Sequence, residues 1–414
     1  MLSALKKYNT HLIVLSVSLS VLLASFFPEI FSSLRFIGEV FINLLKVFSL
    51  PLISTALIVA LGAMNSNLQG LQRLARSTLS YMLVSEIIAV SIALLLFNTF
   101  KPGLGINPQI ILQGGDYLAS KTAELSLANF IVGIFPHNIF DSLVKFDLLP
   151  VVSFSVMFGI GCSLVGEAAK PVIALATSIR DVANSCLLGV MLVAPLGIFS
   201  LVGGGVAQAR LNGNLFATFL ALLSFVLVLL LALFLHGLWQ LLAVALLSKQ
   251  SLGAILRQST PVFATAFATS SSLATLPMAM ETASRLGARP LVTRFMLPVC
   301  ASINIGGMMI YEVAAVLFFS QMLGFDLSLY QQLLLALASI LTGMAAGGIP
   351  ETSMISMVVV FKMANIPLSA ISILLPLDRI LDRLRTMVNI FGNMCAVLVV
   401  SRIIARDQDL GEGS

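Results

Sequence analysis

Apolar residues run through the chain in long segments that short polar stretches separate. A membrane-spanning helix needs about 20 predominantly apolar residues, so eight of these segments are candidate spans. The candidates cover residues 11–27, 36–63, 78–99, 128–168, 171–204, 214–247, 291–323 and 366–402. Several are longer than a direct crossing requires, which predicts tilted or broken helices among them.

Two further apolar stretches, 254–287 and 332–367, are interrupted near their middle. A run of serines at 270–272 divides the first, and the Gly-Gly-Ile-Pro sequence at 347–350 divides the second. Unwound backbone is tolerated at membrane depth only where it is buried in protein or lines a cavity. Paired interruptions of this kind are typical of transporter binding sites. We therefore expect two re-entrant helical hairpins; two ordinary spans with a local kink are the alternative.

Composition and charge support a multi-pass membrane protein. Of the 414 residues, 58% are hydrophobic and 10% are charged, whereas a soluble domain carries about 25% charged residues. With eight spans and two hairpins, both termini lie on one side, and the loops of that side hold more Lys and Arg. Basic loops stay in the cytoplasm, so we expect cytoplasmic termini and an inner or plasma membrane location.

The last apolar segment contains an unusually polar stretch, DRILDRLRTMVNIFGN, at residues 378–393. Asp378, Asp382, Arg385, Asn389 and Asn393 fall at spacings of 4, 3, 4 and 4, which places them on one helix face. A charge at the bilayer centre costs about 2.5–3.5 kcal/mol, so such a face usually lines a cavity. An aspartate can hold an ammonium group, and an arginine can bind a carboxylate through two parallel hydrogen bonds. An acidic amino acid offers both groups; a structural polar seam between helices is the alternative.

Four motifs in this chain resemble those of the glutamate transporter family, the dicarboxylate/amino acid:cation symporters. They are SSSLATLP (270–277), SINIGGMMIYE (302–312), GGIPETS (347–353) and LDRLRTMVNIFGN (381–393). Their order and spacing match the family, and the helix count fits over the whole chain. The resemblance implies an all-α polytopic fold of eight transmembrane helices plus two re-entrant helical hairpins, an elevator mechanism and a homotrimer.

The resemblance also implies a division into a scaffold that holds still and a transport unit that slides through the membrane. Residues 1–70 would form scaffold helices 1–2, residues 101–210 the external loop and scaffold helices 4–5, and residues 71–100 helix 3 of the transport domain. Residues 211–414 would form the transport core: helix 6, hairpin 1 at about 251–287, helix 7, hairpin 2 at about 330–366, and helix 8.

The family's substrate-binding residues carry over by position. Asp382 matches the residue that binds the substrate ammonium, and Arg385 matches the one that binds the side-chain carboxylate. Arg383 matches an arginine that some members place in the first hairpin tip instead, where this chain has Ser270; a structural partner for an acid is its alternative role. The implied substrate-binding set is Ser271, Ser272, Met308, Ile349, Pro350, Asp382, Arg383, Arg385, Thr386 and Asn389.

The chain departs from the family where sodium-coupled members bind Na⁺. Their seventh-helix motif NMDGT reads NIGGM here, so Gly306 replaces an aspartate, and Asn393 replaces a second aspartate. The vestigial sodium positions are Tyr81, Val84, Ser85, Asn304, Ile305, Gly306, Asn389 and Asn393. Because cation affinity depends on ligand charge, we expect sodium coupling to be lost or badly weakened. A compensating site built from backbone carbonyls is the alternative.

Two glutamates are candidates for proton coupling. Glu312 matches a glutamate that is tied to proton transport in the animal members, and Glu86 follows Ser85 near the vacated sodium region. A carboxyl group in an apolar setting can exchange a proton near neutral pH. A structural hydrogen bond for Glu312, and a salt bridge or an interface for Glu86, are the alternatives.

The expected function is sodium-independent secondary transport of aspartate or glutamate, with proton coupling as one option. The alternatives are an uncoupled facilitator or exchanger, a C4-dicarboxylate carrier, and a non-transporting anion channel or sensor. No nucleophile–base pair or catalytic metal cluster indicates an enzyme, and no cofactor is expected. The expected partners are the acidic amino acid, the lipid bilayer and two further copies of the chain, with no nucleic acid.

Overall fold

The chain is helical throughout the part that the structure describes. The computed structural model describes residues 2–62, 69–106, 127–145, 148–211, 215–248, 251–346 and 352–411. Regular structure within these ranges consists of helices, which confirms the all-α class. Ile349 and Pro350, two of the predicted substrate-binding residues, lie outside the described residues.

The helices follow the apolar segments of the sequence closely. The first half of the chain contains α1 (Leu2–Phe26), α2 (Pro28–Gly62), α3 (Gln69–Phe100), α4 (Leu127–Ile134), α5 (Ile139–Lys145), α6 (Leu148–Val165), α7 (Lys170–Val190) and α8 (Ala194–Leu211). The second half contains α9 (Leu215–Ser248), α10 (Leu252–Thr269), α11 (Ser272–Arg285), α12 (Pro290–Ile303), α13 (Gly306–Met322), α14 (Leu329–Ala346), α15 (Thr352–Met363) and α16 (Ile371–Gly411).

Five apolar segments among the described residues are long enough to cross a membrane. They are Arg76–Phe100, Pro150–Cys186, Phe216–Leu247, Pro290–Met322 and Ile380–Ile404. Shorter apolar helices lie at Leu15–Phe26, Leu50–Val59, Ala194–Ala207 and Leu329–Gly343. The chain is therefore a multi-pass membrane protein, while the count of eight spans stays a prediction.

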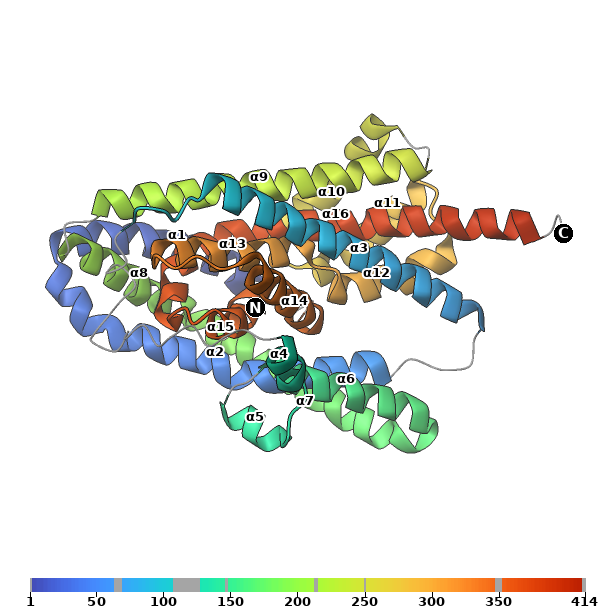
Figure 1. Cartoon of the computed structure of the whole chain (residues 1–414), viewed down its shortest axis with the longest axis horizontal. Coiled ribbons are helices and arrows are strands. Elements are labelled where there is room, and N and C mark those ends of the chain that lie inside the picture. Colours follow the sequence, from blue (N-terminus) through green and yellow to red (C-terminus); the bar gives the residue numbers. More distant parts are fainter. Residues whose placement is uncertain are drawn as a thin grey trace.

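Helix packing forms two groups. In the first, α2 packs against α6, α7 and α8, and α1 packs against α8. In the second, α3, α9, α13 and α16 contact one another, with α10, α11 and α12 packed around α16. Figure 1 shows α9, α3 and α16 running along the long axis of the molecule, with α6 and α7 along its lower edge. Contacts of α16 with α8, and of α14 with α2 and α6, join the groups.

Both interrupted stretches form helical hairpins. Helices α10 and α11 pack against each other, and so do α14 and α15. The first tip turns at Ser270, whose φ of 50° lies in the left-handed region, and Ser271 then caps α11 by accepting a hydrogen bond from the Ala274 amide at 3.2 Å. Serine at these positions is favourable because its hydroxyl satisfies a free amide of the first helical turn. The second tip, 347–351, lies outside the described residues.

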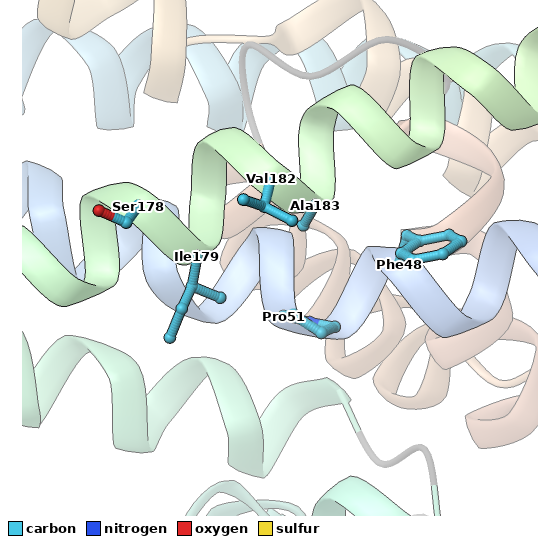
Figure 2. A pocket seen from close by; sticks show the side chains of 6 residues that line it. All are labelled: Phe48, Pro51, Ser178, Ile179, Val182 and Ala183. Atoms are coloured by element: carbon cyan, nitrogen blue, oxygen red, sulfur yellow. The ribbon is translucent and has the colours of Figure 1, made fainter.

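A groove of about 340 Å³ lies between α2 and α7, on the side of the first helix group. Figure 2 shows its lining residues, which are Phe48, Pro51, Ser178, Ile179, Val182 and Ala183. None of these side chains carries a charge. The groove is therefore unsuited to an anionic ligand, and the candidate site lies elsewhere.

Candidate functional site

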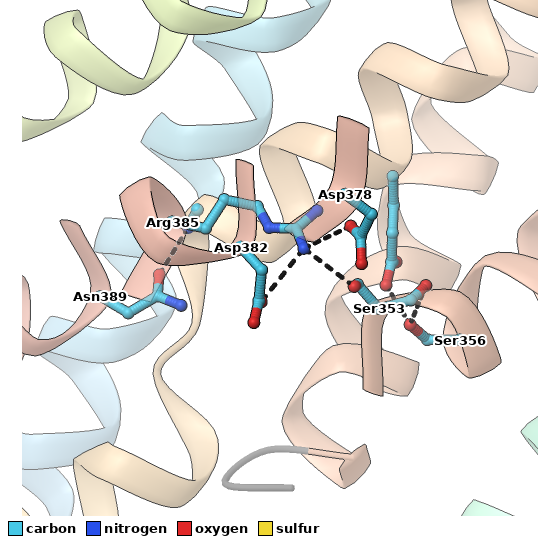
Figure 3. Close-up of polar contacts among 8 residues, drawn as sticks. Ser353, Ser356, Asp378, Asp382, Arg385 and Asn389 are labelled. Atoms are coloured by element: carbon cyan, nitrogen blue, oxygen red, sulfur yellow. Dashed lines mark hydrogen bonds and ion pairs between the residues drawn. The ribbon is translucent and has the colours of Figure 1, made fainter. Parts of the chain in front are cut away.

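Arg385 is the centre of a buried charged cluster on α16. Its side chain is 1% exposed, and its Nη2 atom lies 2.6 Å from Asp378 Oδ1 and 3.1 Å from Asp382 Oδ1. Asp378 is also buried, whereas the Asp382 side chain is 23% exposed. The predicted stripe thus brings these three residues together, and Asp382 lies at its more open edge (Figure 3).

Three neighbours of Arg385 come from outside the predicted binding set. Asp378 was placed on the polar stripe but given no role there. Ser353 on α15 accepts a hydrogen bond from Arg385 Nη2 at 3.1 Å, and the guanidinium lies over the Tyr311 ring of α13, 4.0 Å from its centroid. A guanidinium stacks well on an aromatic face. The second terminal nitrogen, Nη1, has no hydrogen-bond partner among the described residues.

Glu312, one turn along α13 from Met308, is fully buried and bound by two serines. Ser339 of α14 and Ser356 of α15 each donate a hydroxyl hydrogen bond to its carboxylate. Both serines belong to the second hairpin. Ser353, which contacts Arg385, lies one turn from Ser356 on α15 (Figure 3). Because Ser356 donates to Glu312, the same helix contacts both Arg385 and Glu312.

Arg383 connects α16 to the first hairpin. Its Nη1 atom donates to the Phe267 carbonyl at 2.7 Å and to the Ala268 carbonyl at 3.4 Å. Its guanidinium also lies 5.6 Å from the Phe267 ring centroid. These carbonyls belong to the last turn of α10, where a positive charge is favourable because the helix end carries partial negative charge. The structure therefore places Arg383 next to the first hairpin tip. Arg383 and Arg385 are two residues apart on α16, so they point to different sides of the helix.

Of the other predicted binding residues, the structure describes Ser271, Ser272, Met308, Thr386 and Asn389. Ser271 and Ser272 form the start of α11 at the first tip. Met308 is buried in the first turn of α13, and Thr386 is buried on α16 next to Arg385. Asn389 accepts a hydrogen bond from the Gly307 amide at 2.8 Å, which ties α16 to the beginning of α13.

Several of the vestigial sodium positions lie where α12 breaks into α13. A 2.7 Å hydrogen bond joins the side-chain amides of Asn304 and Asn393, and Ile305 separates the two helices. Ser85 of α3 is buried, and the Tyr81 hydroxyl is buried as well. Val84 is 51% exposed, so the structure does not bury it with Tyr81 and Ser85.

Glu86 of α3 reaches the same break. Its side chain is 1% exposed, and its Oε1 atom accepts a hydrogen bond from the Ile305 amide at 2.9 Å. The alternative of a salt bridge for Glu86 therefore finds no support among the described residues. Together with Asn389, it satisfies backbone amides at the start of α13 that have no partner within the helix.

These observations define a class of protein: a multi-pass, all-helical membrane protein in which a buried arginine–carboxylate cluster on α16 contacts the second helical hairpin, and Arg383 of the same helix contacts the first. Comparison with known sequences then gives the family. The profile of the sodium:dicarboxylate symporter family matches residues 10–403, so the chain belongs to this family of transport proteins.

Three curated relatives indicate the range of activities in the family. The chain is 29% identical to the proton/sodium-glutamate symport protein of Geobacillus stearothermophilus, covering 91% of this chain and 89% of the relative. It is 30% identical to the proton/glutamate-aspartate symporter of Escherichia coli (88% and 84%). It is also 30% identical to the C4-dicarboxylate transport protein of Rhizobium johnstonii (96% and 90%). Symport of acidic amino acids or dicarboxylates is therefore the function class of its relatives, and a plasma membrane location fits that class.

Proposed function

We propose that this protein is a secondary transporter of acidic amino acids, aspartate or glutamate. The observation that carries the proposal is the buried side chain of Arg385. Its Nη1 atom has no hydrogen-bond partner among the described residues, and its Nη2 atom contacts Asp378 and Asp382. A guanidinium is the side chain best suited to a carboxylate in two-pronged contact. Ser353 of the second hairpin contacts Arg385, and Arg383 on the same helix contacts the first hairpin, which supports a site that closes over the ligand.

Substrate binding would change the contacts within the cluster, because Arg385 is already paired with Asp378 and Asp382. The side-chain carboxylate of the substrate would bind Arg385, initially at Nη1. Asp382, which contacts Arg385 at 3.1 Å and is the more exposed aspartate, would then turn to hold the substrate ammonium. Two carboxylates around one guanidinium leave an excess negative charge, and an ammonium would balance it. Asp378 would stay with Arg385 and keep the buried guanidinium oriented.

The elevator mechanism and the trimer remain part of this proposal. The mutual packing of α1, α2, α6, α7 and α8 supports a scaffold, and the packing of α3 and α9–α13 around α16 supports a moving unit. The proposed boundaries between the two units lie near residues 70, 100 and 210. A trimer would assemble through the first group.

Sodium independence is proposed from the loss of two aspartates at the break in α12–α13, where Glu86 of α3 supplies a carboxylate from another helix. Asn304 and Asn393 pair with each other, and Gly306 offers no side chain. Val84 faces outward. A hard cation binds strongly where anionic oxygen ligands converge, and two of the family's anionic ligands are absent from this sequence.

Of the two candidate glutamates, Glu312 is the preferred site of proton coupling, and Glu86 is the second choice. The Glu312 carboxylate accepts from Ser339 and Ser356, and both serines sit on the second hairpin. A protonated carboxyl group has one acceptor fewer and one donor more, so at least one serine hydroxyl would have to turn. Proton binding at Glu312 would thereby change how α15 is held, next to Ser353 and Arg385.

A C4-dicarboxylate carrier is the second candidate, because the C4-dicarboxylate transport protein of Rhizobium johnstonii matches 96% of the chain at 30% identity. Such a substrate has no ammonium, so Asp382 would keep its contact with Arg385. The contribution of Asp382 to affinity therefore distinguishes the two. An Asp382→Asn variant should lose aspartate binding in the first case and retain succinate binding in the second.

The test is uptake of labelled aspartate, glutamate and succinate into liposomes that contain the purified protein. Na⁺ and pH gradients are imposed separately. Aspartate or glutamate accumulation that follows the pH gradient and ignores Na⁺ is the expected result. Equilibration without accumulation would identify an uncoupled facilitator, and succinate uptake alone would favour the dicarboxylate carrier. No uptake or exchange of any of the three would overturn the transport proposal.

A further inference from the structure

The beginning of α13 is held by side chains from two other helices, in the space next to Gly306. A Cβ atom built on Gly306 would lie 2.8 Å from His236 Nε2 of α9 and 3.2 Å from Glu86 Oε2 of α3. Both side chains are 1% exposed. The absence of a side chain at Gly306 therefore leaves a volume that a carboxylate and an imidazole occupy together.

His236 is supported in turn by Gln240, one helical turn further along α9. Their side-chain nitrogens lie 2.8 Å apart in a hydrogen bond, and Gln240 is 2% exposed. Gln240 packs directly onto Gly392 of α16, where a Cβ atom would overlap its amide. Gly306 and Gly392 thus leave room for the polar side chains of Glu86, His236 and Gln240. These side chains form a row from α3 across α9 to α16.

Glu86 contacts the backbone at a point where the backbone needs an acceptor. The Ile305 amide precedes α13 and donates to Glu86 Oε1 at 2.9 Å. An anion at this place is also favourable because the N-terminus of a helix carries partial positive charge.

The start of α13 is coupled to the candidate substrate site through α16. The Gly307 amide donates to Asn389, and a Cβ atom at Gly307 would lie 3.2 Å from the Arg385 carbonyl oxygen. This close approach means that a shift of Ile305 and Gly307 displaces the backbone of Arg385 and Asn389. The start of α13, which Glu86 contacts, is therefore packed against the backbone that carries the guanidinium.

We propose that Glu86 is a positioning residue for substrate binding. Glu86 extends from α3 and accepts a hydrogen bond at the start of α13. Together with His236 it fills the space beside Gly306. These side chains hold the break between α12 and α13 in position. This inference rests on the proposed function, because it assigns to Glu86 an effect on the substrate affinity of Arg385.

The experiment compares Glu86→Ala and Glu86→Gln with the wild-type protein in liposomes and in detergent. Glutamine keeps an acceptor oxygen at the same place, whereas alanine removes it. Loss of a hydrogen bond between a carboxylate and a buried amide should raise the aspartate KM and Kd of Glu86→Ala by about tenfold or more, with a smaller change in kcat. Glu86→Gln should restore the affinity to within a few-fold of wild type. The control is Glu167→Gln, whose side chain is 86% exposed.

A second pair of variants removes no hydrogen-bonding group. Gly306→Ala introduces a methyl group that must displace Glu86 or His236, and it should raise the KM in the same direction. Gly253→Ala is its control, because a Cβ atom there meets nothing within 4 Å. This pair tests the inference even if Glu86→Ala fails to fold.

The outcomes separate the inference from the function. A wild-type protein that neither binds nor transports aspartate contradicts the proposed function itself. A wild-type protein that binds aspartate, with unchanged KM in both Glu86→Ala and Gly306→Ala, overturns the positioning role alone. Equal loss in Glu86→Gln and Glu86→Ala also overturns it, since the negative charge rather than the acceptor would then be required.

Discussion

Arg385 and Asp378 form a buried ion pair in which Nη2 and Oδ1 lie 2.6 Å apart and the side chains are 1% and 5% exposed. They are seven residues apart on α16, two turns along one face. Removing two charges from water costs several kcal/mol per ion, and only good geometry with further hydrogen bonds compensates for it. Ser353 and Tyr311 supply such contacts. The pair therefore keeps a guanidinium in place at a depth where a single charge would be unstable.

Arg385→Cys should abolish binding of acidic amino acids. A hydrogen bond to a charged group contributes about 1.5–3 kcal/mol, so the affinity for aspartate should fall by at least about tenfold. A small neutral amino acid is the substrate that such a variant would accept instead. Calorimetric titration with aspartate and with serine measures both effects. Unchanged aspartate affinity would contradict the role of Arg385.

The same substitution also leaves Asp378 as a buried carboxylate without its partner, which costs about 3–5 kcal/mol in other buried pairs. A double variant, Arg385→Cys with Asp378→Asn, removes both charges and should recover thermal stability without recovering aspartate affinity. This pair of measurements separates loss of the fold from loss of the binding group.

Arg383→Gln should loosen the first hairpin tip. The substitution removes the charge that contacts the Phe267 and Ala268 carbonyls, and a charge at a partly buried helix end contributes up to about 2 kcal/mol. In a Ser270→Cys background without the natural cysteines, thiol labelling at the tip should become faster. Arg402→Gln is the control, since Arg402 is an exposed arginine on the same helix. Equal labelling rates in both variants would contradict the contact.

Glu312→Gln should flatten the pH dependence of aspartate affinity. An amide cannot take up a proton in this range, and it offers one acceptor oxygen instead of two, so Ser339 and Ser356 cannot both donate to it as they do to the carboxylate. Aspartate Kd is measured from mildly acidic to mildly alkaline pH, with Glu167→Gln as the control. If the aspartate Kd of Glu312→Gln depends on pH as steeply as that of the wild type, proton coupling belongs to another group.

The local features of the site could be predicted from the sequence because they lie within single segments. The serine run at 270–272 predicts the first hairpin tip, and the structure has the turn at Ser270 and the cap at Ser271. The spacing of Asp382 and Arg385 predicts that both face one side of a helix, and they contact each other.

The partners supplied by other helices could not be predicted in this way. Ser353 and Arg385 are 32 residues apart, and Glu86 and Ile305 are 219 residues apart, so no periodicity relates them. Glu86 was expected near the vacated sodium region, but its contact with a backbone amide depends on how α3 packs on α13. His236 occupies space that is free because Gly306 has no side chain. This relationship cannot be seen until α9 and α13 are placed next to each other.

Gly203→Ala should destabilise the packing of α8 on α2. A Cβ atom at Gly203 would overlap the Phe31 ring, whereas a Cβ atom at Gly204 meets nothing within 4 Å. Small residues let membrane helices approach closely, and overpacking costs about 1–3 kcal/mol. The thermal midpoint of the purified protein should fall for Gly203→Ala and stay unchanged for Gly204→Ala. Equal midpoints would mean that Phe31 moves aside at little cost.

Aspartate affinity should be nearly the same in sodium, potassium and choline buffers of equal ionic strength. An ion that strengthens substrate binding must itself be bound more tightly when substrate is present, because the coupling is reciprocal. Here the break between α12 and α13 is held by Glu86 at Ile305, by Asn389 at Gly307 and by the amide pair of Asn304 with Asn393. These contacts link the break to α3 and α16 through side chains of the chain itself.

The decisive measurement is a titration of aspartate affinity with Na⁺ at constant ionic strength and constant pH. A steep rise would mean that oxygens near the break bind the ion despite the missing aspartates, and would contradict the proposed loss of the sodium sites. Repeating the titration in Glu86→Gln then locates the effect, since a rise that this variant abolishes would assign the ion to the space beside Gly306. A flat response to Na⁺ together with a pH-dependent affinity supports proton coupling. A flat response to both supports the uncoupled facilitator.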